Sequence, residues 1–193
     1  MQPMRSLQNH FLIATPAMRD PYFARSVTYL CEHNDEGAMG LVVNQPVNIT
    51  VTDMLRQLKL VEDDEPSELS GRYVFSGGPV NPERGFVIHT SKRGFNASLA
   101  LGDSLMVTTS IDILSALGAN HGPERFMVTL GYAGWEAGQL EKELADNSWL
   151  LVPADGGFAE ELLFNTPPSQ RWQKACERLG FDIWQLSNDV GHA

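Results

Sequence analysis

Hydrophobic residues follow two different spacings along this chain, and the change from one to the other predicts its secondary structure. Alternation with a period of two, or a short apolar run, is typical of a β-strand, whereas recurrence every three or four positions is typical of an amphipathic helix. The first pattern predicts strands at residues 26–33, 38–43, 73–75, 84–89, 104–108, 127–130 and 148–152. The second predicts helices at residues 52–60, 110–117, 139–146, 158–164 and 169–179.

The stretch from Met127 to Trp149 shows both patterns in succession. Met127 to Leu130 is a short apolar run that predicts a buried strand, and Gly131 to Gly134 predicts a tight turn after it. Residues 139–146 then carry leucines four positions apart with charged residues between them, which is typical of an amphipathic helix. Strand, glycine turn and helix form a unit that is common both in binding sites and in plain connections.

The order of the predicted elements indicates the fold class. Several strands precede a helix-rich final third, with some alternation of strand and helix, so we expect an α+β or mixed α/β fold. No internal repeat, low-complexity tract or long polar linker divides the sequence. Residues 1–193 are therefore expected to form a single domain.

The composition is that of a globular protein with an acidic surface. Hydrophobic residues make up 42% of the 193 positions and charged residues 20%, which argues against intrinsic disorder. Acidic residues outnumber basic ones by 24 to 14, and the resulting net charge of −10 opposes non-specific binding to nucleic acids. We therefore expect no direct nucleic-acid partner.

No apolar run approaches the ~18 residues that a membrane-spanning helix needs, and the apolar stretch near the N-terminus is too short for a signal peptide. Cys31 and Cys176 are the only cysteines, which is not the pattern of a secreted disulfide scaffold. We expect a cytoplasmic protein with two reduced thiols and no membrane partner.

The common catalytic signatures are missing from the sequence. It contains no Walker loop, no G-x-G-x-x-G, no G-x-S-x-G and no H-E-x-x-H motif. No cofactor and no metal are expected, and the balance leans away from an enzyme.

Cys31-Glu32-His33 is the nearest approach to a chemical cluster. Residues two apart on a regular strand share a face, so His33 would lower the pKa of the Cys31 thiol and make it nucleophilic. The alternative is that Cys31 packs as a small apolar group and His33 lies at a loop edge. We favour this alternative because no third, orienting residue can be named.

Glycine-rich segments at predicted strand ends supply the other candidates. Gly77 and Gly78, with Arg84 nearby, could present backbone donors and a guanidinium to an anion, or could simply form a turn. Tyr132 and Trp135 would either line a pocket or seal the core against the last helix. We predict a ligand-binding surface built from Asn44, Gly77, Gly78, Arg84, Gly131, Tyr132 and Gly134.

Ten short motifs, spread over nearly the whole chain, resemble the bacterial YqgE/AlgH family. They are F-L-I-A-T-P-A-M from Phe11, D-P-Y-F-A-R-S-V from Asp20, C-E-H from Cys31, G-A-M-G-L-V-V-N from Gly37, G-G-P-V from Gly77, R-G-F-V-I-H from Arg84, L-G-Y-A-G-W from Leu130, G-Q-L-E from Gly138, N-S-W-L from Asn147 and the closing G-H-A.

The resemblance implies a compact domain with a partly barrel-like, bifurcated β-sheet flanked by helices. It carries over no catalytic residues, and one family name comes from a proposed regulatory role in alginate production. The family often has a basic residue where this chain has Gln45, so any anion contact made there would be lost.

We therefore expect a non-catalytic binding or regulatory domain that acts indirectly on gene expression through a protein or small-molecule partner. An enzyme or redox-responsive protein using Cys31 is the first alternative, and a direct transcriptional regulator is the second and less favoured one. The sequence does not identify the partner or the oligomeric state.

Overall fold

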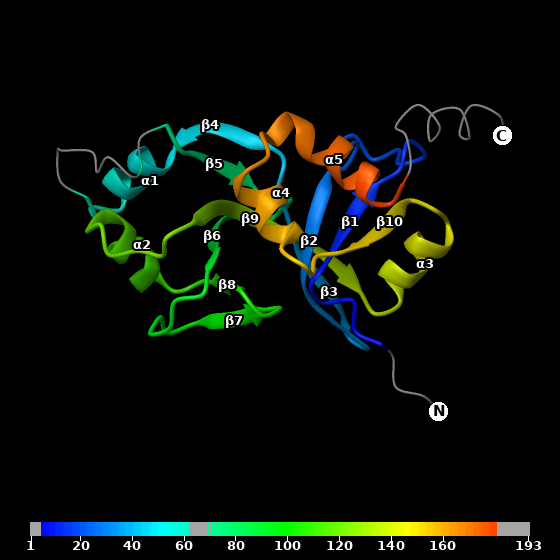
Figure 1. Cartoon of the computed structure of the whole chain (residues 1–193), viewed down its shortest axis with the longest axis horizontal. Helices are drawn as coiled ribbons and strands as arrows, with labels where there is room; N and C mark the ends of the chain where they lie inside the picture. The colour runs from blue at the N-terminus through cyan, green and yellow to red at the C-terminus, as the bar shows by residue number, and fades with distance from the viewer. Residues whose placement is uncertain (1–4, 62–68, 70, 181–193) are drawn as a thin grey trace.

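The computed structural model of the chain describes residues 5–61, 69 and 71–180 (Figure 1). Its strands are β1 (His10–Ala14), β2 (Val27–Asn34), β3 (Gly37–Val42), β4 (Pro46–Thr50), β5 (Tyr73–Ser76), β6 (Val80–Thr90), β7 (Ser98–Leu101), β8 (Leu105–Thr108), β9 (Phe126–Glu136) and β10 (Trp149–Pro153). Its helices are α1 (Val51–Gln57), α2 (Ile111–Gly118), α3 (Gln139–Ala145), α4 (Phe158–Phe164) and α5 (Arg171–Arg178), with a 3₁₀ turn, η2 (Pro168–Gln170), before α5.

The strands form one curled sheet that divides at β9. Its main path runs β10-β1-β2-β3-β9-β6-β8-β7, and all pairings along this path are antiparallel. A branch of two strands leaves this path, because β5 pairs in parallel with β9 and β4 pairs with β5. The α+β fold class and the bifurcated half-barrel sheet are thus confirmed.

One face of the sheet, here called the inner face, carries the largest hydrophobic cluster. That cluster gathers side chains from most of the strands together with α4 and α5; its larger members include Phe11, Tyr29, Phe86, Ile88, Met127, Phe158, Leu162 and Trp172. Trp172 also donates from its indole nitrogen to the carbonyl of Ala14 at 2.8 Å, which ties α5 to β1. Helices α4 and α5 thus cover part of the inner face.

The opposite face is covered in two separate places, on either side of the molecule in Figure 1. Beneath α1 and α2 lies a cluster that includes Leu55, Ile113, Phe126 and Val128. Beneath α3 lies another, which includes Leu12, Leu30, Trp135, Leu140 and Trp149. No helix in the described part of the chain is long and apolar enough to cross a membrane.

Because of Gly131, β9 contributes side chains both to the cluster under α1 and α2 and to the cluster under α3. Before it, Phe126 and Val128 face α1 and α2; after it, Ala133 and Trp135 face α3. On the face opposite the inner face, the side chains of β9 therefore come from even-numbered residues before Gly131 and from odd-numbered residues after it. This change of parity requires a break in the regular pleat, and Gly131 supplies it with a left-handed φ of 79°.

Two local predictions need correction. The expected turn at Gly131–Gly134 is not a turn, because β9 continues unbroken to Glu136. Strand β4 was not predicted, because it opens with Pro46, which cannot donate to a sheet. Pro46 is tolerated there because β4 pairs only with β5 and lies at an edge of the sheet.

Candidate functional site

Arg84 and Tyr132, two of the predicted site residues, lie in one groove on the inner face. The groove encloses about 560 Å³ and lies beside the part of that face covered by α4 and α5. Six strands contribute to its wall, which consists of Glu32, Met39, Arg84, Phe86, Ala97, Ser98, Leu99, Val107, Thr109 and Tyr132. A hollow of this size, with an apolar floor and a few polar groups, has the character of a binding site.

Aromatic contacts position the two predicted residues at the groove. The Arg84 guanidinium lies 5.3 Å from the centre of the Phe86 ring, and Phe86 meets Tyr132 edge to face at 5.9 Å. Tyr132 reaches this face only because the break at Gly131 turns it away from α1 and α2. Gly131 thus affects the groove indirectly, by setting the face of the sheet on which the Tyr132 side chain lies.

The groove offers charges of both signs. Glu32 and Arg84 are both exposed on its wall, and among the described residues no ion pair joins them. Ser98 adds a hydroxyl, which bonds Thr108 at 2.7 Å; Thr108 in turn bonds the buried imidazole of His89 at 2.7 Å. Burial lowers the pKa of His89, so this chain of contacts is uncharged at neutral pH.

The predicted site residues Gly77, Gly78 and Gly131 lie at the fork of the sheet, where β3, β5 and β9 meet. Gly77 donates its N–H to the carbonyl of Leu130 on β9 at 2.7 Å and accepts from the N–H of Val42 on β3 at 2.8 Å. A Cβ on Gly77 would lie 2.4 Å from the Gly131 oxygen, and one on Gly78 would lie 2.0 Å from the Tyr132 carbonyl carbon. These backbone groups therefore contact each other, and the expectation that they bind an anion stays a prediction.

Gly134 and Asn44 lie apart from this fork. A Cβ on Gly134 would meet only the Tyr132 ring, at an ordinary 3.7 Å. The Asn44 amide accepts from the N–H of Val27 and donates to the carbonyl of Arg25, each at 2.9 Å. Asn44 thus joins the end of β3 to the start of β2, and neither residue lines the groove.

Cys31 and His33 do not form the nucleophilic pair that was the less favoured interpretation of this segment, and His33 is buried within β2 where a loop edge was expected. The register of β2 on β3 shifts between Leu30 and Glu32, so Cys31 occupies the extra position of a β-bulge. Cys31 packs in the inner-face cluster, whereas the ring of His33 hydrogen-bonds Glu141 on α3, which covers the opposite face. The bulge places them on opposite faces, which the spacing alone could not reveal.

The environments of both side chains argue for structural roles. Burial raises the pKa of the Cys31 thiol to about 12, the reverse of what a nucleophile needs. His33 accepts from the N–H of Leu7 at Nδ1, so its Nε2–H donates to Glu141. That hydrogen bond lowers the pKa of the Glu141 carboxyl. Trp135 was predicted either to line a pocket or to seal the core against the last helix. It packs in the cluster under α3, and its indole N–H donates to the Glu143 carboxylate at 3.1 Å.

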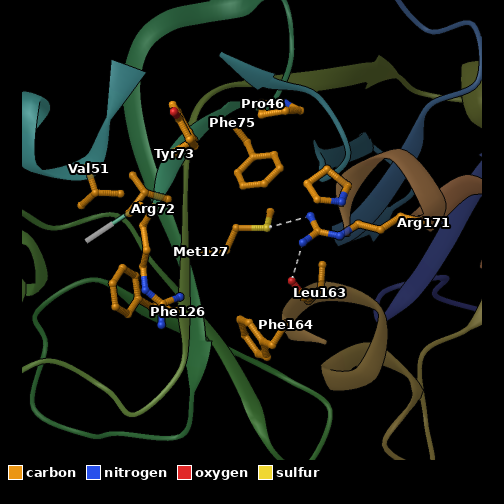
Figure 2. A pocket seen from close by; sticks show the side chains of 13 residues that line it. Pro46, Val51, Arg72, Tyr73, Phe75, Phe126, Met127, Leu163, Phe164 and Arg171 are labelled. Carbon is orange, nitrogen blue, oxygen red and sulfur yellow. Dashed lines mark hydrogen bonds between the residues drawn. The ribbon is translucent and has the colours of Figure 1, made fainter. Parts of the chain in front are cut away.

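A second cavity, of about 310 Å³, lies between β5, β9 and helices α4 and α5 (Figure 2). We call it the arginine pocket; it is lined by Pro46, Val51, Gly71, Arg72, Tyr73, Phe75, Phe126, Met127, Val128, Leu163, Phe164, Pro168 and Arg171. The sequence analysis did not single out Arg171. The available signal was its position: an arginine four residues before Ala175, on the apolar stripe of the last helix.

The described residues hold no group of three or more His, Cys, Asp or Glu side chains that could bind a metal ion. Both cysteines are buried free thiols. Burial also raises the pKa of Cys176, to about 11.

Comparison with known proteins places these features in a family. A family model described as AlgH-like matches residues 11–184. The UPF0301 protein IL2218 of Idiomarina loihiensis is 61% identical over 190 residues, covering 98% of this chain and all of the relative. The UPF0301 protein PSHAa2600 of Pseudoalteromonas translucida is 53% identical with the same coverage.

Two solved structures share the fold. The solution structure of the AlgH protein from Pseudomonas aeruginosa has a TM-score of 0.78 and 46% identity, and the match covers 97% of each chain. The crystal structure of DIP2367 from Corynebacterium diphtheriae has a TM-score of 0.67 over 92% of this chain and 90% of the other; at 21% identity it supports the fold alone.

Proposed function

The chain belongs to the AlgH-like family, and from that premise we propose that it is a non-catalytic, cytoplasmic binding domain that acts on gene expression indirectly. The observation that carries the proposal is the groove that Arg84 and Tyr132 both line. Its apolar floor, with one charge of each sign on the wall, suits an extended peptide segment of a partner protein. A small molecule with both polar and apolar parts is the other kind of occupant.

The residues that line the groove do not include the candidate nucleophile, so the proposal does not assign a reaction to it. The candidate nucleophile, Cys31, lies inside the core with a raised pKa, and it is not among the groove residues. Direct contact with DNA is not proposed either, because the acidic net charge of −10 repels phosphate groups. An indirect route through a bound partner therefore fits the chain better than either alternative.

The first test is native mass spectrometry of the purified full chain beside its denatured mass. A co-purified small molecule that disappears in the Arg84→Glu variant would make the occupant a small molecule. If the native mass equals that of the polypeptide alone, the next experiment is affinity capture from a lysate of the source bacterium, with the parent chain and with Arg84→Glu.

Arg93→Glu is the matched control, because Arg93 is exposed and lies outside the groove. We expect a partner to be retained by the parent chain and by Arg93→Glu, and to be lost from Arg84→Glu and Tyr132→Ser. Equal retention by all four proteins would refute the groove as the binding site.

A further inference from the structure

Arg171 places a positive charge inside the protein, and the described part of the chain supplies no matching negative charge. Its side chain comes from the first turn of α5 and points toward Phe75 and Met127 in the arginine pocket (Figure 2). The residue is 5% exposed, and within the described residues it forms no ion pair with a carboxylate. Buried charges are normally paired, because removing an ion from water is costly.

The contacts that Arg171 makes within the described residues are all with neutral acceptors. Nε donates to the carbonyl of Thr166 at 3.0 Å, Nη2 donates to that of Leu163 at 2.7 Å, and Nη1 donates to that of Val43. Nη1 also points at the Met127 sulfur, 3.6 Å away, which is a weak acceptor. A guanidinium has five N–H groups, so one on Nη2 has no acceptor among the described residues.

The surroundings of Arg171 are suited to the rest of a small ligand. The pocket wall is largely aromatic and aliphatic, and the Arg171 guanidinium lies 5.1 Å from the centre of the Phe75 ring. Arg72 lies at the opposite side, with its guanidinium 4.7 Å from the centre of the Phe126 ring. Among the described residues that line the pocket, two are arginines and none is acidic.

We propose that the arginine pocket binds a small organic anion, with its carboxylate or phosphate group at Arg171 and its apolar body against Phe75, Phe126 and Phe164. Charge-assisted hydrogen bonds from a guanidinium to such a group are stronger than those to neutral acceptors. The anion would displace the weak sulfur contact, use the unmatched N–H and neutralise the buried charge. The site is separate from the groove, and this inference does not depend on the function proposed for the groove.

Methionine methyl resonances of the full chain give the test. Met127 lines the arginine pocket and Met39 lines the groove, so one spectrum with isotope-labelled methionine reports on both sites. Met127→Leu and Met39→Leu assign the two resonances. The probes are phenylacetate, hexanoate and phenyl phosphate, each beside a neutral counterpart: phenylacetamide, hexanamide and phenol.

We expect at least one anion to shift the Met127 resonance. The affinity of its neutral counterpart should be lower by a factor of about ten or more. The Met39 resonance should stay in place. If no anion shifts Met127, or if each neutral compound binds as well as its anion, the proposal is wrong. A shift of Met39 alone would support the groove and refute the anion site, so the two proposals fail separately.

A matched pair of variants at the pocket rim tests the charge without disturbing the core. Tyr73 lines the pocket and is 50% exposed, so substitutions there should fold. Tyr73→Glu should weaken binding of the anion several-fold relative to Tyr73→Gln, which has nearly the same shape but no charge. Equal affinities in the two variants would contradict the proposal. Arg171→Lys is the less useful variant, because a single ammonium nitrogen cannot replace the contacts that Nε, Nη1 and Nη2 make with three separate carbonyls, and the fold is expected to lose stability.

Discussion

Cys31 illustrates how one inserted residue decides the chemistry of a segment. A regular strand would place Cys31 and His33 on one face, but the bulge in β2 sends the thiol into the inner-face cluster and His33 toward α3. With burial raising its pKa to about 12, the thiol stays protonated at neutral pH. The segment thus contributes packing and a hydrogen bond, which is the interpretation that the sequence analysis favoured for Cys31.

We expect Cys31 to resist alkylation in the folded protein. Iodoacetamide at pH 8 should modify neither Cys31 nor Cys176 of the native chain, and should modify both after denaturation, because both thiols are buried. Intact-mass analysis at successive times provides the readout. Rapid modification of native Cys31 would restore the thiolate hypothesis.

At the scale of the elements, β9 organises the sheet. It pairs with β6 along one edge, while β5 and β3 share the other, and Gly77 joins the two branches by bonding both β9 and β3. Side chains are excluded where these backbones meet. Three of the glycines predicted to contribute to a ligand surface, Gly77, Gly78 and Gly131, are therefore required for the branching itself.

Two glycines of the same strand allow a matched test of this conclusion. Gly131→Ala places a Cβ 2.3 Å from the Gly78 oxygen at a left-handed φ of 79°. We expect it to lower the free energy of unfolding by about 2–5 kcal/mol through strain and overpacking. Gly134→Ala meets only the Tyr132 ring at 3.7 Å, and should change stability by about 0.5 kcal/mol or less.

Urea unfolding followed by tryptophan fluorescence measures both variants. Similar losses of stability in the two proteins would show that close backbone contact at the fork is not what selects glycine.

At the scale of the whole molecule, charge sets which partners can approach. The net charge of −10 repels polyanions at long range, while the arginine pocket offers a small anion a short-range site screened by protein. The molecule can therefore discriminate by size among negatively charged partners. The single domain predicted for residues 1–193 and the cytoplasmic location stay predictions.

We expect the full chain to show no binding to duplex DNA at about 150 mM salt, since non-specific binders need a basic surface. Fluorescence anisotropy of a labelled duplex, measured over a range of salt concentrations, provides the check. Binding that is specific in sequence and weakens steeply with salt would revive the direct transcriptional regulator.

The sequence by itself determined the local elements and, through its motifs, the family. Seven of the strands and all five helices were predicted close to their positions, because spacing of apolar residues acts over a few neighbours. It also brought forward Arg84 and Tyr132, since both lie near glycines at predicted strand ends.

Only the tertiary structure decided which of these residues meet. The change of face at Gly131 and the fork at Gly77 involve strands that are distant in sequence, so no local pattern encodes them. The bulge at Cys31 depends on the register of β2 against the next strand, β3, which the apolar pattern of β2 alone does not fix. The burial of Arg171 likewise depends on β3, β9 and the end of α4 closing around it. Contacts across the chain therefore decided where the groove and the arginine pocket lie and which charges they contain.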